Sequence, residues 1–75
     1  MHIEVKREMD LEIDTEHNVG YLLLDKERPI KRQTVLNRMG LVVDWDGDGG
    51  IVGIEFLAAR AQLGPVWDEM LGKET

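Results

Sequence analysis

The chain has 75 residues, of which 15 are acidic and 9 are basic, so we expect a single small domain over residues 1–75 with a net charge of −6. The absence of cysteine excludes disulfides, thiol nucleophiles and cysteine-type zinc sites. The apolar runs are far shorter than the roughly 18 residues of a membrane span, and the N-terminal residues alternate instead of forming the apolar core of a signal peptide, so we expect a cytoplasmic protein with no membrane partner.

The first two predicted elements form a hairpin. Over residues 1–13 apolar side chains occupy the odd positions and polar ones the even positions, with Arg7 as the exception. This period of two predicts a strand, which is either continuous with a bulge or divided by a short turn at residues 6–8. Residues 14–18 are turn formers, and the apolar run over residues 19–24 predicts a second strand that is buried on both faces.

Residues 30–43 follow a turn-prone stretch and admit two interpretations. Their apolar positions fit helical spacing, but residues 33–36 and 41–43 also fit two strands that are interrupted at Gly40. The β-branched content favours the strands. Both interpretations stay open at this point.

Residues 41–57 predict a hairpin. Two β-rich runs flank Asp46–Gly49, whose D-x-x-G form is typical of a type I turn with a glycine at a positive φ. Within the second run Gly53 predicts a place where another backbone or ring approaches closely, and Tyr21 is the candidate neighbour.

The same residues also match the pattern of a calcium-binding EF-hand loop. Carboxylates stand at loop positions 1, 3 and 5, glycine at position 6 and glutamate at position 12, which is the arrangement that converges on one calcium ion. A hairpin excludes this interpretation, because it carries the glutamate along its strand and away from the turn. We expect the hairpin and no cofactor, with calcium as the alternative; its ligands would be Asp44, Asp46, Asp48 and Glu55.

The C-terminal part predicts a short helix. Residues 58–63 have high helix propensity, Gly64 and Pro65 interrupt them, and an apolar stripe follows. Such a stripe caps the core or faces a partner. Because a core of this size supplies only about 3–5 kcal/mol, we expect a homodimer. Its interface would include Val66, Trp67, Met70 and Leu71.

These elements predict an α+β domain, a small antiparallel β-meander of four to five strands with a C-terminal helix on one face. The carboxylate pair Asp14 and Glu16 has no accompanying nucleophile or oxyanion donor, so no catalytic residue is assigned and no enzyme is expected. Five of the nine basic residues lie between residues 26 and 38, but the surrounding acidic chain argues against a nucleic-acid partner.

Two blocks of residues resemble the DUF2283 family of small bacterial and phage proteins. Asp14, Glu16 and Tyr21–Leu22 match the first block of the family pattern. Val43–Asp44, Asp46, Gly49 and residues 51–57 match the second block. The chain departs from the family at Asn18, Gly20 and Gly50. The resemblance implies a compact β-meander with a terminal helix and no assigned activity, and it implies an antitoxin or partner-binding role.

From the residues and the resemblance together we expect a non-enzymatic protein-interaction module, encoded by a bacterium or a phage. Its partner would be another protein, bound through an acidic face or an open sheet edge. An antitoxin-like neutraliser of a small basic toxin is a further alternative, for which the net charge of −6 would steer association.

Overall fold

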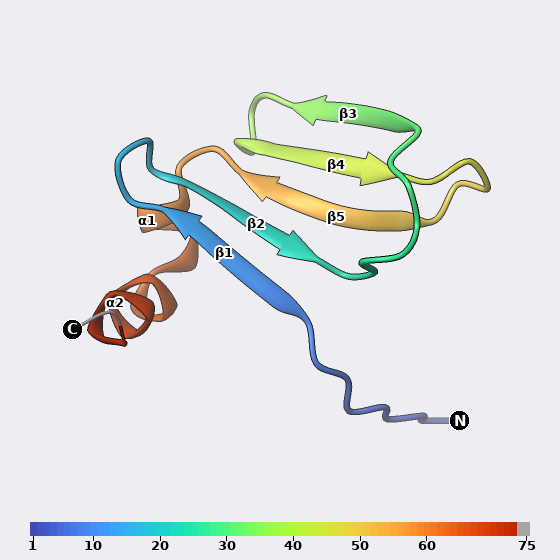
Figure 1. The fold of residues 1–75 in the computed structure, drawn as a ribbon, viewed down its shortest axis with the longest axis horizontal. Coiled ribbons are helices and arrows are strands. Elements are labelled where there is room, and N and C mark those ends of the chain that lie inside the picture. Colours follow the sequence, from blue (N-terminus) through green and yellow to red (C-terminus); the bar gives the residue numbers. More distant parts are fainter. Residues whose placement is uncertain (74–75) are drawn as a thin grey trace.

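The computed structural model describes residues 1–73 and consists of one five-stranded antiparallel sheet with two short helices (Figure 1). This confirms the small α+β fold. The strands are β1 (Asp10–Asp14), β2 (Val19–Leu23), β3 (Arg32–Leu36), β4 (Leu41–Trp45) and β5 (Ile51–Phe56), and the helices are α1 (Ala59–Leu63) and α2 (Pro65–Gly72). Among the described residues, no helix is long and apolar enough to cross a membrane.

The strand order is β1-β2-β5-β4-β3. The chain forms a hairpin from β1 and β2 and a three-stranded meander from β3, β4 and β5, and β2 then pairs with β5 and not with β3. This pairing sets Tyr21 opposite Glu55 and Leu23 opposite Gly53. It makes β5 the central strand and leaves β1 and β3 as the two edges of the sheet.

Both turns of the meander depend on glycine. Gly40 and Gly49 have φ values of 65° and 85°, which residues other than glycine adopt only at a cost in free energy. In the β4–β5 turn, Asp46 Oδ1 accepts the backbone N–H groups of Asp48 and Gly50, both at 2.8 Å. The hairpin prediction is therefore confirmed, and residues 30–43 form strands and not a helix.

The first strand is shorter than its sequence pattern predicts. Residues 1–9 form no strand, and β1 begins at Asp10, which lies opposite Leu23 at the end of β2. Beyond that pair, β2 has ended and the chain turns away towards β3. A strand needs a partner for its backbone groups, so the alternating pattern alone does not extend β1. We call residues 1–9 the arm.

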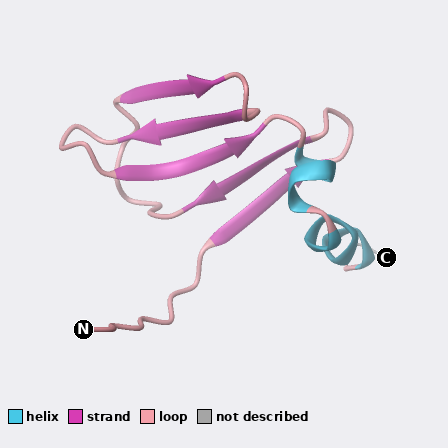
Figure 2. Cartoon of the chain, turned by 180° about the vertical axis from the view of Figure 1, so that it is seen from behind, coloured by secondary structure: helices cyan, strands magenta, loops and turns pink. Residues whose placement is uncertain are grey.

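The two faces of the sheet differ. Gly20 lies against Ala59 and Leu63 of α1, so this face carries the helices, and the opposite face is open (Figure 2). The most deeply buried apolar residues are Val52, Ala59 and Trp67. Only 4% of Trp67 is exposed, so this residue belongs to the core of its own chain. Of the other residues expected at a dimer interface, Val66 and Leu71 are exposed, and Met70 is half-buried.

Candidate functional site

The open face of the sheet collects carboxylates from three strands. Side chains alternate between the two faces of a strand, so Asp10, Glu12 and Asp14 of β1 all point to the open face. Cross-strand pairing places Glu55 of β5 and Asp44 of β4 on the same face. Carboxylates that are scattered along the sequence therefore share one face of the sheet, where Asp44 is buried and the other four are not. We call it the acidic face.

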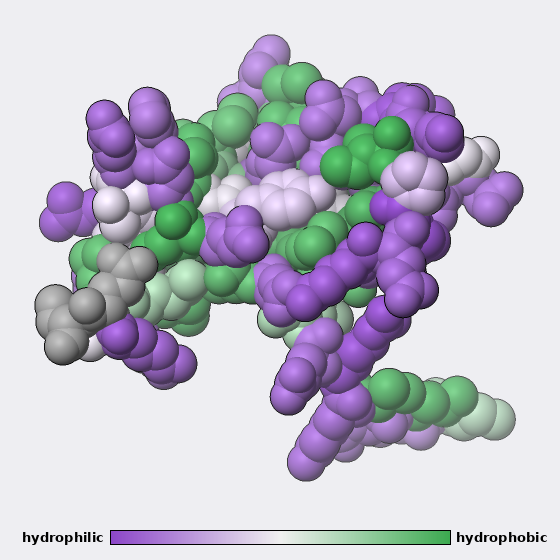
Figure 3. Space-filling model, viewed as in Figure 1, coloured by the Kyte–Doolittle hydropathy of each residue, from purple (hydrophilic) through white to green (hydrophobic). Residues whose placement is uncertain are grey.

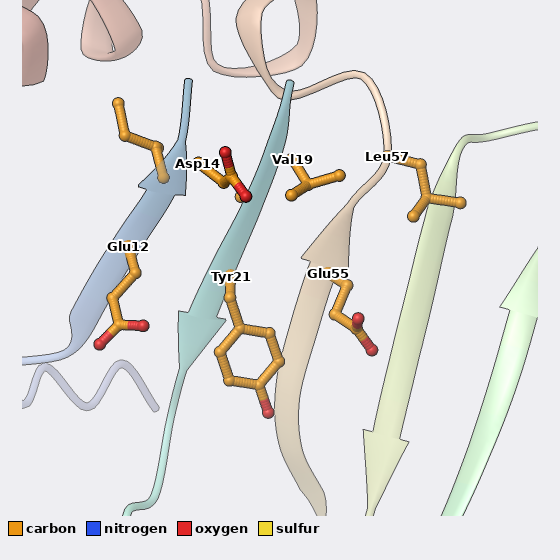
Figure 4. Close-up of a pocket in the computed structure, with 8 residues that line it drawn as sticks. Glu12, Asp14, Val19, Tyr21, Glu55 and Leu57 are labelled. Atoms are coloured by element: carbon orange, nitrogen blue, oxygen red, sulfur yellow. The ribbon is translucent and has the colours of Figure 1, made fainter. Parts of the chain in front are cut away.

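A pocket of about 270 Å³ lies in the acidic face. Glu12 of β1, Tyr21 of β2 and Glu55 of β5 occupy one cross-strand row, and Figure 4 shows the tyrosine ring between the two carboxylates. Val19 and Leu57 line the pocket further along the strands. With Asp14 at the end of β1, the pocket thus combines three carboxylates, an aromatic ring and an apolar wall.

Tyr21 lies over Gly53, its diagonal neighbour on β5. A Cβ atom on Gly53 would lie 2.5 Å from the Tyr21 hydroxyl oxygen and 2.7 Å from its Cζ atom. This confirms that the glycine marks a close approach and that Tyr21 is the neighbour. An aromatic ring packed over a glycine in a sheet fixes the ring and shields the bare backbone.

Burial and negative charge keep the Tyr21 hydroxyl neutral. Its oxygen is buried and makes no hydrogen bond with the described residues 1–73. Burial, and next the adjacent Asp44 carboxylate, raise the pKa of Tyr21 to about 12. The hydroxyl therefore carries no charge at neutral pH.

Asp44 and Glu55 lie close enough to interact, with Gln33 between them. Asp44 is 1% exposed and accepts a hydrogen bond from Gln33 Nε2 at 2.7 Å, and the same nitrogen donates to Glu55 Oε2 at 3.3 Å. Burial, and next the charge of Asp44, raise the pKa of Glu55. One amide therefore bridges two carboxylates that repel each other.

Asp14 stabilises the β1–β2 turn at the end of the pocket. Its Oδ1 accepts the backbone N–H groups of Glu16 and His17 at 3.0 and 3.1 Å, and its Oδ2 lies 2.8 Å from His17 Nδ1. The hydrogen bond from the His17 side chain is the main cause that lowers the pKa of Asp14. The carboxylate pair Asp14 and Glu16 thus belongs to the β1–β2 turn, and of the two only Asp14 lines the pocket.

A family model described as a protein of unknown function (DUF2283) matches residues 11–60. The chain belongs to this family. No curated protein and no solved structure matches the chain. The DUF2283 region contains nearly the whole sheet and all residues of the pocket, whereas the arm and α2 lie outside it. The pocket is therefore built within the part of the chain that defines the family.

The structure does not bring together the four ligands of the EF-hand interpretation. Asp46 pairs with Arg28, and Asp48 is exposed at the turn. Glu55 lies six residues beyond Gly49 on β5, about 20 Å along the strand. Only Asp44 and Glu55 come together, and residues 1–73 contain no group of three or more His, Asp or Glu side chains placed to hold a metal ion.

Arg28 holds the β4–β5 turn in place. Its Nε donates to Asp25 Oδ2 at 3.0 Å, its Nη1 donates to Asp46, and its Nη2 donates to the Ile51 carbonyl oxygen at 2.9 Å. The sequence marked Arg28 only as a member of a basic segment. Its role could not be read from spacing, because it joins the β2–β3 connection to a turn 18 residues further along the chain.

The raised pKa of Glu55 predicts a gain in stability on its neutralisation. A carboxyl whose pKa is higher in the folded than in the unfolded state stabilises the protein at low pH and loses that contribution as the pH rises through the folded pKa. At pH 7 we therefore expect Glu55→Gln to raise the free energy of unfolding by about 0.5 kcal/mol, since it removes a repulsion with Asp44. Urea unfolding measures this change.

The matched control is Glu12→Gln, on the exposed edge strand of the same pocket. Relative to the wild type, the free energy of unfolding should change less in Glu12→Gln than in Glu55→Gln. The difference between Glu55→Gln and the wild type should also shrink as the pH falls through the raised pKa of Glu55, and it should be lost below 4.5, the ordinary pKa of a glutamate. A loss of stability in Glu55→Gln at pH 7 would contradict the described repulsion.

Proposed function

We propose that this DUF2283 chain is a non-enzymatic interaction module that binds a basic segment of another protein on its acidic face. The observation that supports this proposal most is the cross-strand row of Glu12, Tyr21 and Glu55, in which an aromatic ring lies between two carboxylates. Within residues 1–73 neither glutamate forms an ion pair. The nearest cation is Lys26, which pairs with Asp10 and acts on Glu12 only through its charge, so the row keeps carboxylates that are free to bind a partner.

An arginine side chain matches this pocket in charge and in shape. Its guanidinium group binds carboxylates through several N–H donors and stacks on aromatic rings, so it suits the space over Tyr21 between Glu12 and Glu55. Its aliphatic stem would lie against Val19 and Leu57. The carboxylates of the pocket accept hydrogen bonds, and the Tyr21 hydroxyl is neutral at pH 7. The pocket therefore favours a cation over an anion.

The charge of the whole chain adds to the attraction. A net charge of −6 accelerates encounter with a basic protein at low ionic strength. Neutralisation of a small basic toxin is the second candidate function, and this charge is the observation that favours it. In both cases the chain acts in the cytoplasm of a bacterium, or of a bacterium infected by a phage, and the partner contributes arginine or lysine side chains.

The binding site can be tested with a fluorescently labelled peptide of nine arginines as the probe. At about 50 mM salt, where charge attraction is weakly screened, we expect the double variant Glu12→Gln/Glu55→Gln to bind it at least about tenfold more weakly than the wild type. The matched control Glu27→Gln/Glu69→Gln removes the same charge outside the pocket and should stay within about twofold. Equal weakening in both double variants would show attraction to net charge alone and would contradict the site.

A further inference from the structure

The arm projects from the edge strand β1 with an apolar side that its own chain leaves uncovered. Figure 3 shows it extending away from the body, with hydrophobic side chains along one side. Its apolar residues alternate with charged or polar ones and are half or more exposed: Met1 113%, Ile3 74%, Val5 78% and Met9 50%. Alternation of this kind fits a strand with one buried face, and the partner strand is missing from the described chain.

The charged positions of the arm are complementary to themselves when two arms run antiparallel. With Val5 opposite Val5 of a second copy, Glu4 lies opposite Lys6 and His2 lies opposite Glu8, and each pair occurs twice by symmetry. Directly opposed residues of an antiparallel pair share a face, so these side chains meet on the polar side. The sequence of the arm is therefore complementary to a second copy of itself in an antiparallel pair.

The apolar positions agree with the same register. Met1 lies opposite Met9, Val5 lies opposite its own copy, and Ile3 lies opposite the aliphatic stem of Arg7. The alternation of β1 places these odd positions on the helix-bearing face of the sheet, together with Leu11. The apolar side of the paired arms would thus continue the apolar side of each sheet.

Neighbouring registers bring like charges together. With the twofold axis at Lys6, the two Lys6 side chains lie opposite each other and Glu4 lies opposite Glu8. With the axis at Arg7, the two Arg7 side chains lie opposite each other and Glu4 lies opposite Asp10. A centre at Glu4 opposes glutamate with itself. If one arm were shifted along the other by an odd number of residues, apolar residues would lie opposite charged ones, because each residue of the shifted arm would change face. A centre at Ile3 opposes no like charges but pairs only residues 1–5, so the centre at Val5 is the one that pairs all nine residues of the arm without opposing like charges.

We propose that residues 1–9 of two copies pair as an antiparallel two-stranded ribbon with its twofold axis at Val5. Because a lone two-stranded ribbon is marginal in water, it needs cover on its apolar side. A groove lined by Met9, Leu11, Val66 and Met70 lies beside the base of the arm. Met1 of the partner subunit would lie opposite Met9, at this groove, where it covers the exposed side of Val66.

Charge reversal tests the register. The wild-type chain should sediment at about twice its mass of 8.6 kDa at tens of micromolar. Glu4→Lys and Lys6→Glu each place like charges opposite one another at two symmetric positions, so each should weaken the dimer about tenfold. The double variant Glu4→Lys/Lys6→Glu restores opposite charges and should return to within about twofold of the wild type. Glu16→Lys, with the same charge change on the β1–β2 turn, is the control.

Crosslinking provides an independent readout. In this register Val5→Cys brings two thiols together across the twofold axis, so mild oxidation should give a covalent dimer, and Arg7→Cys should give much less. A wild type that stays monomeric at about 100 μM would overturn the proposal. So would a double charge variant that remains as weak as the single ones, or an Arg7→Cys variant that crosslinks better than Val5→Cys.

Discussion

Replacement of Gly53 by alanine is expected to lower the free energy of unfolding by about 2 kcal/mol. The new Cβ atom would lie 2.5 Å from the Tyr21 hydroxyl oxygen, 2.7 Å from its Cζ atom and 3.0 Å from the Leu22 carbonyl oxygen. The tyrosine can swing aside only by leaving the pocket, whereas the carbonyl belongs to the ladder between β2 and β5. Urea unfolding followed by tryptophan fluorescence measures the change.

Two further variants separate the role of the ring from that of the backbone. Gly47→Ala is the matched control, since its Cβ atom would meet only Lys31 Cγ at 3.7 Å, and it should cost less than about 0.5 kcal/mol. The double variant Gly53→Ala/Tyr21→Ala also removes the ring. Its loss in free energy of unfolding should therefore be smaller than the sum of the losses of the two single variants. Additive losses would mean that the ring does not constrain Gly53.

Replacement of Trp67 by alanine is expected to have the largest effect, a loss of about 3–5 kcal/mol. Trp67 is 4% exposed and is the buried residue of α2, so its removal opens a cavity in the core. A core of this size supplies about the same amount in total. We therefore expect Trp67→Ala to be largely unfolded at 25 °C, with its far-ultraviolet circular dichroism reduced accordingly.

The position of Trp67 also predicts how this loss depends on protein concentration. An interface anchor would lose stability mainly through dissociation, so its effect would diminish at high concentration. A core residue loses the same packing at every concentration. Leu71→Ala, at the exposed side of the same helix, is the control and should cost about 1 kcal/mol or less. Recovery of folded Trp67→Ala on concentration would show that Trp67 acts between subunits.

The sequence predicted the strands well where local chemistry decides them. The turn residues Asp46 and Gly49, the alternation around them and the break at Pro65 each have a physical cause within a few residues. The arm shows the limit of this reasoning. Apart from Arg7, its residues alternate like those of a strand, but its backbone has no strand partner within the described chain. A pattern in one segment does not reveal whether a partner exists.

The acidic face could be predicted only in part. Tyr21 was expected beside Gly53, because a glycine in a β-rich run indicates a close approach. The row of Glu12, Tyr21 and Glu55 was missed, because it depends on the pairing of β2 with β5, strands that are separated by two others in the chain. A register between distant strands is set by the packing of the whole sheet, not by spacing in the sequence.

A titration that follows backbone amides by nuclear magnetic resonance tests the acidic face most directly. On addition of the nine-arginine peptide, we expect the largest shift changes at Glu12, Tyr21 and Glu55 and at their neighbours on β1, β2 and β5. These changes should saturate together, and they should shrink in Glu12→Gln/Glu55→Gln. Changes that are largest on β3, or that are spread evenly over the acidic residues outside the pocket, would contradict a binding site on this face.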